Sequence, residues 1–450
     1  MRINIPCEVN YIINKLNENS HEAYIVGGCV RDALLNKEPN DWDVTTSATP
    51  EEIKSIFKDT NRICNIGEKH GTIGVVINRE TYEITTYRID GTYSDNRKPD
   101  EVEFTTSLKE DLKRRDFTIN AMAYNNKDGL IDLFGGKDDL NNKLIRCVGN
   151  PQKRFTEDAL RIMRMIRFAA QLDFRIDTDT AETAANCSNN LSLISKERIR
   201  DELIKIITSD NPEKLTEMYL LNITHGTKTL RYIDQLVGCQ QNTPHHIYDV
   251  FEHTIQTLKN IENDEILRLT MLFHDIGKPN AKTVSDMGFD RFIGHEKEGE
   301  RITREIMKEL RFDNATIDKV TTLVRYHDYR VSTSPRAVRR ALSKIGADLF
   351  PLYIKVRLAD IAGQSDFEKQ SKINNIHAVR ALYKTIIESN QAFTLKDLEI
   401  NGNDLIKLGI KPGPRLGEIL KDCLDLVIED PKNNNKEHLL KLIETIVNKD

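Results

Sequence analysis

Two acidic residues near the start of the chain have the spacing of a metal-binding pair. Asp41 and Asp43 flank Trp42 at the head of an expected strand, whose two-residue period places both carboxylates on one face. Carboxylates held close together suit Mg²⁺, which takes oxygen ligands along with substrate phosphates. Metal chemistry of this kind can deprotonate an attacking hydroxyl and stabilise a leaving pyrophosphate. Glu83, in a later expected strand, could supply a third carboxylate.

A pair of glycines lies upstream of the acidic pair. The expected strand Ala23–Val26 runs into Gly27 and Gly28, and an expected helix, Cys29–Leu35, follows. Glycines let the backbone approach a ligand, and a helix N-terminus favours an anionic phosphate. Arg31, one turn into the helix, is expected to reach the same phosphates as Gly28. Each motif alone is usually a turn or a surface pair, but their order is much more specific for phosphoryl transfer.

The second half of the chain carries histidines and aspartates in an order typical of a metal centre. The residues of ligand type are His253, His274, Asp275, His295, His327 and Asp360. Imidazole and carboxylate ligands together suit a divalent transition metal, or a pair of metals, that activates water. A single His-Asp pair is more often a structural hydrogen bond, whereas the ordered set favours a metal site. His245 and His246 are expected to be structural or to lie at its rim.

The overall charge gives no signal for nucleic-acid binding. The 450 residues carry a net charge of −5, with a pI near 6.2, so RNA would have to bind a local basic surface. Arg336, Arg339, Arg340 and Lys344 form a basic helix face that could grip phosphates, although a solvated face is the commoner outcome.

Cysteine usage and hydropathy indicate a chain of the reducing cytoplasm. The seven cysteines are scattered and form no C-x-x-C pair, which argues against a disulfide framework or a cysteine zinc site. No apolar run has the length of a membrane span, and the N-terminus lacks a secretory pattern. No membrane association is therefore expected.

Strand signals are concentrated in the first third of the chain. Short β-branched runs predict strands at Ala23–Val26, Trp42–Thr46, Thr72–Ile77, Thr81–Tyr87, Val102–Thr105 and Leu144–Val148. Asn78 and Arg79 predict a hairpin turn, Thr49 a helix start, and Arg88–Asp100 a mobile loop. From Pro151 onward the pattern is helical. We expect an α+β protein, a small mixed β-sheet head followed by helices, whose parts are residues 1–150, 151–243, 244–390 and 391–450.

Six stretches in the first half of the chain carry a family resemblance. They are Tyr24–Leu35 (YIVGGCVRDALL), Asn40–Thr46 (NDWDVTT), Arg114–Tyr124 (RRDFTINAMAY), Asp132–Leu140 (DLFGGKDDL), Arg154–Phe168 (RFTEDALRIMRMIRF) and Glu197–Leu203 (ERIRDEL). In this order they resemble the polymerase-beta-like nucleotidyltransferases, and in detail the bacterial class II tRNA nucleotidyltransferase and poly(A) polymerase family. The resemblance implies a sheet head with helical neck, body and tail, and addition of CMP, CMP and AMP from CTP and ATP to the tRNA 3′ end. It makes the acidic pair catalytic and places Arg115, Arg164 and Arg167 at the nucleotide sugar and phosphates.

One expected helix could choose the incoming base without a nucleic-acid template. The helix around Ala159–Leu172 is expected to carry Asp158, Arg161, Arg164 and Arg167 as a slanting stripe, which in isolation would be an i,i+3 salt bridge on a solvated surface. Cytosine and adenine both present an amino donor beside a ring-nitrogen acceptor. One carboxylate and one guanidinium can therefore accept both bases, while uracil and guanine would leave polar groups unpaired. The resemblance assigns this templating role to Asp158 and Arg161.

Two stretches bear on which nucleotides are added. Arg88–Val102 resembles the flexible loop of enzymes competent for the final A, which relatives that add only CC largely lack. Arg62–Val75 does not resemble the basic signature of poly(A) polymerases. Complete CCA addition is therefore favoured, and addition of A alone and poly(A) synthesis are the alternatives.

The histidine and aspartate set resembles the HD superfamily of metal-dependent phosphohydrolases, with all six residues in place. The resemblance implies a second phosphodiesterase or phosphatase activity, which could clear 2′,3′-cyclic phosphates from damaged RNA ends. Two further alternatives are a phosphohydrolase whose head only binds RNA and an RNA-binding regulator without activity. The intact acidic pair and the intact Asp158–Arg161 pair argue against the first. The regulator would require both metal sites to be inactive, and neither looks damaged in the sequence.

Overall fold

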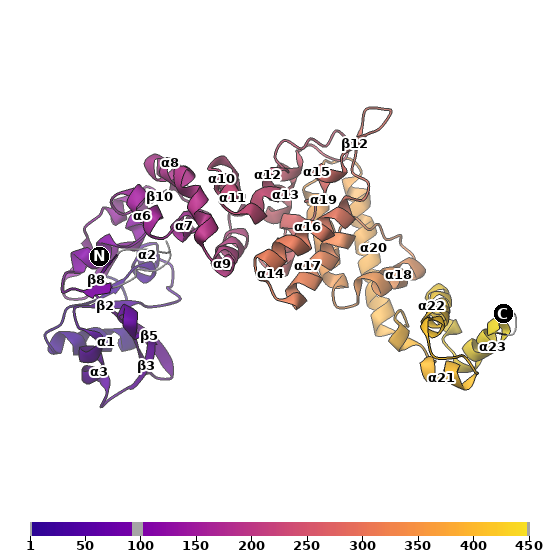
Figure 1. The fold of residues 1–450 in the computed structure, drawn as a ribbon, viewed down its shortest axis with the longest axis horizontal. Coiled ribbons are helices and arrows are strands. Elements are labelled where there is room, and N and C mark those ends of the chain that lie inside the picture. Colours follow the sequence, from indigo (N-terminus) through magenta and orange to yellow (C-terminus); the bar gives the residue numbers. More distant parts are fainter. Residues whose placement is uncertain (1, 92–101, 448–450) are drawn as a thin grey trace. The chain divides into compact units, whose positions relative to one another are not determined.

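The computed structural model describes residues 2–91 and 102–447 of the chain. The chain divides into two compact units, Met1–Asp234 and Gln235–Asp450, and each is considered by itself (Figure 1). The main sheet belongs to the first unit, and the second unit consists of helices and one short ribbon. The predicted α+β class, with a mixed sheet followed by helices, is confirmed.

The main sheet has seven strands in the order β3-β4-β5-β2-β1-β8-β9. They are β1 (Ala23–Val26), β2 (Val44–Thr46), β3 (Arg62–Gly67), β4 (Thr72–Ile77), β5 (Glu80–Thr86), β8 (Met122–Asn125) and β9 (Gly129–Asp132). Neighbouring strands are antiparallel, except that β2 and β5 run parallel, with Val44 opposite Ile84. β1 is completely buried between β2 and β8, and the helices α1 (Cys7–Glu18) and α2 (Gly28–Leu34) pack against it.

Local sequence signals predict several of these elements correctly. β1 and β4 have the predicted bounds, and Asn78 and Arg79 form the predicted hairpin turn with φ of 51° and 72°. This left-handed backbone is what a two-residue hairpin turn requires. Thr49 and Glu52 form a capping box at the start of α3 (Pro50–Phe57), as the sequence predicts.

Two predictions near the acidic pair and the loop are wrong. The strand predicted over Trp42–Thr46 begins only at Val44, so the acidic pair lies just before β2 and not within it. Arg88–Asp90 forms β6 and pairs with β7 (Val102–Phe104), where a loop is predicted, because the two segments complete a small antiparallel ribbon. The rest of that predicted loop, residues 92–101, lies outside the described residues.

The ends of the sheet also differ from the prediction. The strand predicted over Leu144–Val148 shrinks to β10 (Leu144–Ile145), because its only described strand partner is the two-residue β11 (Arg175–Ile176). The strands β3, β8 and β9 are not predicted at all. They contain asparagine, glycine or methionine in place of a continuous β-branched run.

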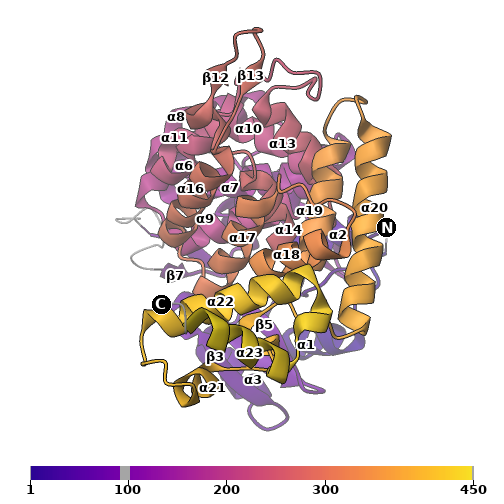
Figure 2. The ribbon, with the colours of Figure 1, turned by 90° about the vertical axis from the view of Figure 1, so that its right-hand side faces the viewer.

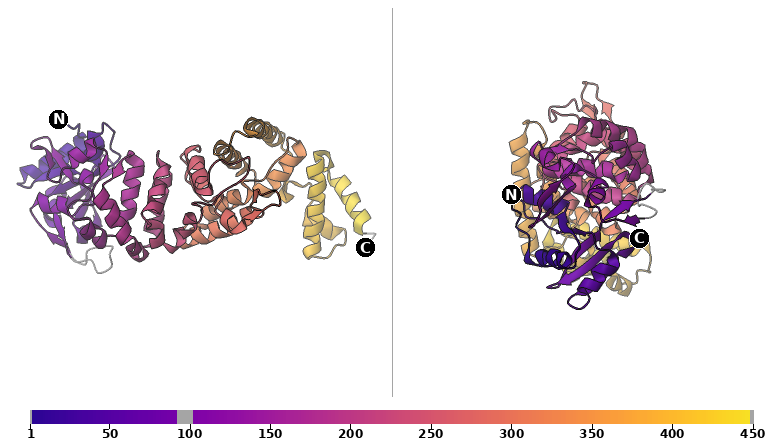
Figure 3. Two further views of the ribbon diagram at one scale, coloured as in Figure 1. Left: turned by 90° about the horizontal axis from the view of Figure 1, so that it is seen from above. Right: turned by 90° about the vertical axis from the view of Figure 1, so that its left-hand side faces the viewer.

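Helices complete the first unit (magenta in Figure 3). They are α4 (Leu108–Lys113), α5 (Gly136–Asn141), α6 (Pro151–Glu157), α7 (Leu160–Leu172), α8 (Thr178–Cys187), α9 (Lys196–Ile207), α10 (Leu215–Leu220), α11 (Ile223–Gly226) and α12 (Arg231–Asp234). Asp158 lies between α6 and α7 with φ −138° and ψ 102°, and its side chain accepts the amide of Leu160 at 3.0 Å. The prediction that Asp158 shares a helical stripe with Arg161 is therefore wrong, because the chain is extended at Asp158.

Hydrophobic cores hold the helices of the second unit together. Its helices are α13 (Val250–Lys259), α14 (Glu265–Phe273), α15 (Lys278–Ala281), α16 (His295–Glu309), α17 (Asn314–Tyr326), α18 (Pro335–Ile345), α19 (Phe350–Ala362), α20 (Lys369–Glu388), α21 (Gly402–Lys407), α22 (Pro414–Glu429) and α23 (Lys436–Val447). One core joins α18, α19 and α20 around Phe350, and another joins α21, α22 and α23 around Val427. The ribbon β12 (Thr283–Val284) and β13 (Asp290–Arg291) projects at the top of Figure 2. Within the described part of the chain, no helix is long and apolar enough to cross a membrane.

The basic face of α18 is divided, because the side chains of Arg336 and Arg340 are partly exposed and Arg339 is buried in a packing contact. Arg339 is 4% exposed, and its guanidinium donates to the carbonyl oxygens of Ile428 (2.9 Å) and Glu429 (3.1 Å). Arg336 and Arg340 form ion pairs with the Glu429 carboxylate. For Arg339, the predictions of a solvated position and of a phosphate-binding position are both wrong, because its guanidinium donates to the last carbonyl oxygens of α22.

We expect substitutions of Arg339 and of Arg336 to differ in their effect on the free energy of unfolding. Arg339→Met leaves buried carbonyls without a donor and should lower the free energy of unfolding by about 1–3 kcal/mol. Arg336→Met removes only an exposed ion pair and should change it by less than about 1 kcal/mol. Urea unfolding followed by circular dichroism compares the two variants. Equal losses would contradict the capping role of Arg339.

Candidate functional site

Three carboxylates share one cavity of the first unit. Asp41, Asp43 and Glu83 line a cavity of about 820 Å³, together with Glu8 and other polar side chains. The parallel register of β2 and β5 explains the arrangement, since Asp43 precedes Val44 and Glu83 precedes its partner in β5. The structure thus brings together the acidic pair and the third carboxylate that the sequence suggests.

Electrostatics in this cavity favour a bound cation. Burial raises the pKa of the Asp43 carboxyl against the attraction of Arg115, and the neighbouring Asp41 raises it further. Burial also raises the pKa of Glu83, and the charges of Asp43 and Asp41 add to the effect. Carboxylates that destabilise one another's charge in this way are a suitable donor set for a divalent metal ion.

The glycine pair lies beside an arginine of a later motif. Gly27 has a φ of +83°, which disfavours residues with a side chain, and a Cβ atom there would come within 3.0 Å of Nη1 of Arg115. The helix α2 begins at Gly28, one residue earlier than predicted. Arg31 donates to the Asn120 side chain at 2.7 Å. Gly28, Arg31 and Arg115 therefore lie in one region of the first unit, as their predicted role requires.

Three arginines surround the ring of Phe168. The guanidinium carbons of Arg31, Arg164 and Arg167 lie 5.2, 5.3 and 4.2 Å from its centroid. Attraction between a guanidinium and an aromatic face holds such side chains in place. The ring thus connects α2 with α7. Phe168 was not singled out from the sequence, although this residue ends one of the stretches that carry the family resemblance.

Two acidic residues balance the charge of these arginines. Arg164 pairs with Asp116 at 2.6 Å, and Arg167 pairs with Glu202 at 3.1 Å. Burial raises the pKa of Asp116, but the attraction and hydrogen bond of Arg164, together with Arg161 and Asn120, outweigh burial and lower that pKa. Asp116 and Glu202 were also missed, because only the fold brings them to α7.

The two residues expected to choose the base have separate partners. Asp158 accepts from Nη2 of Arg198 at 2.9 Å. Arg161 donates from Nη1 to Glu157 at 2.7 Å and from Nη2 to the carbonyl of Arg114 at 2.9 Å. The backbone joins Asp158 and Arg161, since the Arg161 amide donates to the Asp158 carbonyl oxygen at 3.0 Å, and each side-chain charge is held by an opposite charge or dipole.

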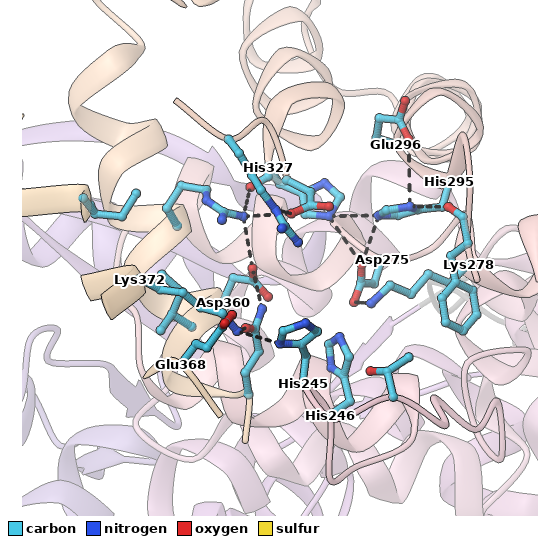
Figure 4. Close-up of a pocket in the computed structure, with 18 of the residues that line it drawn as sticks. His245, His246, Asp275, Lys278, His295, Glu296, His327, Asp360, Glu368 and Lys372 are labelled. Carbon is cyan, nitrogen blue, oxygen red and sulfur yellow. Dashed lines mark hydrogen bonds and ion pairs between the residues drawn. The ribbon is translucent and has the colours of Figure 1, made fainter. Parts of the chain in front are cut away.

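A second constellation gathers in the second unit. Two groups of side-chain atoms converge closely enough to hold a metal, namely His253, His274 and Asp275, and Asp275, His295 and His327. Asp275 belongs to both groups. Asp360 lies 3.1 Å from Nε2 of His253 but in neither group. Asp275, His295, His327 and Asp360 line a cavity of about 720 Å³, and His245 and His246 line it too (Figure 4).

Backbone carbonyls fix the histidine rings for metal binding. Nδ1 of His274, His295 and His327 each lies 2.7 Å from the carbonyl oxygen three residues earlier. A carbonyl only accepts, so Nδ1 carries the proton and Nε2 of the neutral ring presents a lone pair. Nε2 atoms of His295 and His327 are 3.2 Å apart, which is unfavourable for two lone pairs unless a proton or a metal cation lies between them. Burial alone would lower the pKa of His327, but Asp275 and the neighbouring carboxylates raise it, so a positive charge is favoured at this position.

Unsatisfied buried atoms point to the same conclusion. Nε2 of His274 and Oδ1 of Asp275 are buried without a hydrogen-bond partner among the described residues. Burial, and then the neighbouring His327, lower the pKa of His295 to about 4, so this ring is neutral near pH 7. Neutral imidazoles and an ionised carboxylate are the ligand forms that bind metals. The residues present therefore fit a divalent metal.

Comparisons with known proteins define the class of protein to which this fold belongs. The family model described as "Poly A polymerase head domain" matches residues 23–146. Residues 173–225 match "Probable RNA and SrmB- binding site of polymerase A", and residues 295–443 match "tRNA nucleotidyltransferase domain 2 putative". The first unit thus has the head of a nucleotidyltransferase.

Full-length relatives narrow this class to one family. The CCA-adding enzyme of Enterococcus faecalis is 35% identical over 430 residues, which cover 95% of this chain and 93% of the relative. That of Lactobacillus johnsonii is 35% identical over 96% of this chain and 95% of its own. The chain belongs to the CCA-adding enzyme family. The crystal structure of the Bacillus stearothermophilus CCA-adding enzyme in complex with CTP aligns with a TM-score of 0.75, at 26% identity and 98% coverage of both chains.

We expect the histidine centre of the second unit to bind a divalent metal ion with measurable affinity. In an Asp43→Asn background, which disables the acidic site, the protein should bind Mn²⁺ or Zn²⁺, and His274→Ala should weaken that binding by about tenfold or more. His377, an exposed histidine of α20, provides the matched control His377→Ala. Isothermal titration measures both. Unchanged affinity in His274→Ala would show that the centre binds no metal.

Proposed function

We propose that this protein adds CMP, CMP and AMP to the 3′ end of tRNA, using CTP and ATP and releasing pyrophosphate. One observation carries the proposal: Asp41, Asp43 and Glu83 share a cavity in a chain that is 35% identical to a CCA-adding enzyme over 95% of its length. In the reaction the 3′-oxygen of the RNA attacks the α-phosphorus of the nucleotide and loses its proton. The bond from that phosphorus to pyrophosphate breaks.

The acidic cavity would hold the metal of this reaction. Asp41 and Asp43, with Glu83 beside them, match the oxygen preference of Mg²⁺. A bound ion would supply activation of the attacking hydroxyl and neutralisation of the leaving pyrophosphate. Gly28 and the arginines Arg31, Arg115, Arg164 and Arg167 would bind the nucleotide sugar and phosphates. The ring of Phe168 supports this assignment, because it gathers three of those arginines.

Asp158 and Arg161 would read the base. Asp158 accepts three contacts in the structure, one from Leu160 and two from Arg198, and an ionised carboxylate offers about four acceptor positions. It can therefore still accept the amino group of cytosine or adenine. Arg161 would donate to the ring nitrogen. The carbonyl of uracil or guanine would face the Asp158 carboxylate and be rejected.

Complete CCA addition is favoured over addition of A alone. The relatives that support it are named CCA-adding enzymes and match nearly the whole chain. The predicted loop for the final A falls largely on residues outside the described part and adds no structural support. A location in the reducing cytoplasm is part of the proposal and agrees with the seven free cysteines.

A primer-extension assay with Mg²⁺ tests this activity. tRNA transcripts ending before CCA, after C and after CC are each given CTP, ATP or both. The expected product is completion of CCA followed by a halt. Growth only from the CC end would identify an A-adding enzyme, and long A tails a poly(A) polymerase. Asp43→Asn should abolish extension, whereas Asp59→Asn, at an exposed aspartate of the same unit, should not.

We propose a second activity for the histidine centre, a metal-dependent phosphohydrolase. The observation that favours it is the set of lone pairs from His253, His274, His295 and His327 converging around Asp275. A transition metal suits this nitrogen and oxygen donor set and, when bound, would activate water. Lys278 and Lys372 of the same cavity are placed to meet a phosphate (Figure 4). Phosphoesters at damaged RNA ends, including 2′,3′-cyclic phosphates, are the proposed substrates.

Two variants separate the two activities. Hydrolysis of a 2′,3′-cyclic nucleotide by the Mn²⁺-loaded full chain should disappear in His274→Ala and persist in Asp43→Asn. Extension of tRNA should show the opposite pattern, because the residues lie in different units. Absence of hydrolysis in a protein that demonstrably binds the metal would rule out this second activity and leave the first intact.

A further inference from the structure

The cavity beside the histidine centre extends well beyond the candidate metal ligands. Its volume of about 720 Å³ is in the range of sites that enclose a whole small-molecule ligand, whereas one phosphate group would fill only part of it. The start of α20 forms one wall, to which it contributes Ser371, Lys372, Asn375 and Ile376. This wall lies apart from the two groups of side chains that could hold a metal. It is therefore available to a part of a ligand that the metal does not contact.

One side-chain amide connects this wall to the ligand set. Nε2 of Gln364 donates to Oδ2 of Asp360 at 3.0 Å, and Oε1 of Gln364 accepts from Nζ of Lys372 at 2.8 Å. Nδ1 of His245 accepts from the same Nζ at 3.1 Å. An ammonium group has three N–H donors, and these two neutral acceptors occupy two of them. Lys372 is thus held one residue away from Asp360, with a donor left for a ligand.

The charge of Lys372 is not neutralised by a carboxylate. Both of its hydrogen-bond partners are neutral, and among the residues that the structure describes it forms no ion pair. Burial lowers the pKa of His245, and the charges of Lys372 and Arg330 lower it further, against smaller opposite effects of Glu368 and Asp328. A positive potential therefore prevails at this wall, which favours an anionic ligand.

The two lysines of the cavity lie on opposite sides of the metal ligands. Lys278 donates to Oδ2 of Asp275 at 2.6 Å, whereas Lys372 reaches Asp360 only through Gln364. Figure 4 shows Lys278 on the right and Lys372 on the left, with Asp275 and Asp360 between them. A phosphate bound at the metal beside Lys278 would leave Lys372 for a second negative charge.

We propose that Lys372, with Arg330 near it, forms a second anion subsite that binds the next phosphodiester of an RNA strand whose terminal phosphoester lies at the histidine centre. The inference rests on the proposed phosphohydrolase activity and narrows its substrates to RNA 3′ ends in preference to free mononucleotides. A strand fits because each of its nucleotides carries one negative charge, so a strand that presents one phosphate to the metal brings another close to it. A protein that extends RNA 3′ ends meets such strands.

The test compares two substrates of the Mn²⁺-loaded full chain, a 2′,3′-cyclic mononucleotide and a trinucleotide that ends in the same cyclic phosphate. We expect a higher kcat/KM for the trinucleotide. Lys372→Gln should lower the ratio of the two values by about tenfold, because it removes a charged hydrogen bond to the second phosphate. Lys372→Arg keeps the charge and should give a smaller fall. Lys369→Gln makes the same change of charge on α20, where Lys369 pairs with Asp366 outside the cavity lining, and should leave the ratio unchanged.

Binding provides a second readout that needs no catalysis. Fluorescence anisotropy measures the Kd of a labelled trinucleotide with a 3′-phosphate for the full chain prepared without metal. Lys372→Gln should raise this Kd, and Lys369→Gln should not. An unchanged Kd in Lys372→Gln, together with an unchanged ratio of kcat/KM, would overturn the inference.

The remaining outcomes separate this inference from the proposed activity. Equal losses for the mononucleotide and the trinucleotide in Lys372→Gln would show that Lys372 only orients Asp360 through Gln364, so the subsite would be wrong and the activity would stand. Equal use of both substrates by the unaltered protein would have the same meaning. If the metal-loaded protein cleaves neither substrate, the activity fails and the inference fails with it. Thermal unfolding identifies a misfolded variant, and Lys372→Arg then decides the outcome.

Discussion

Repulsion between the carboxylates of the acidic cavity is the physical constraint that the fold of the first unit has to overcome. Asp41, Asp43 and Glu83 face one cavity, and the burial and proximity that raise the pKa values of Asp43 and Glu83 also oppose their approach. The parallel pairing of β2 with β5 holds two of them together in spite of this cost. The arginines around Phe168 pose the opposite problem, which Asp116 and Glu202 relieve by pairing with α7. A metal ion and a nucleotide triphosphate are the two ligands that would satisfy both clusters.

In the second unit, most of the candidate metal ligands are histidines, which can bind a metal as neutral rings. Several imidazole rings converge around Asp275, and hydrogen bonds from Nδ1 to backbone carbonyls determine which nitrogen of each ring faces the centre. The carbonyls of Met271 and Val324 belong to the helices α14 and α17, so the backbone that builds the core also orients the rings of His274 and His327, whereas Phe292 lies in the segment before α16. The centre is therefore preorganised by secondary structure, whereas the acidic site of the first unit is preorganised by strand register.

The sequence predicted the residues of both sites better than the contacts within them. Motif spacing was sufficient for the acidic pair and the histidine set, because strand register and short helical turns position those side chains locally. It failed at Asp158, where no proline or glycine marks the break between α6 and α7. That break is accompanied by a bond to Leu160 and by an ion pair with Arg198, forty residues away. The contacts of Phe168 and the capping role of Arg339 were not predicted for the same reason. Contacts between segments that are distant along the chain produce no periodic pattern in the local sequence.

Affinity and choice of base are therefore supported by different physical means in this fold. Three of the arginines assigned to the nucleotide sugar and phosphates share one aromatic ring, and their positive charge does not distinguish one base from another. The groups assigned to the base each contact an oppositely charged residue, Arg198 for Asp158 and Glu157 for Arg161. Donor and acceptor geometry discriminates between bases only when it is fixed, because a carboxylate that turns can avoid an unfavourable carbonyl. If Asp158 and Arg161 read the base as proposed, ion pairs that would add little to stability on an open surface would support the choice of nucleotide.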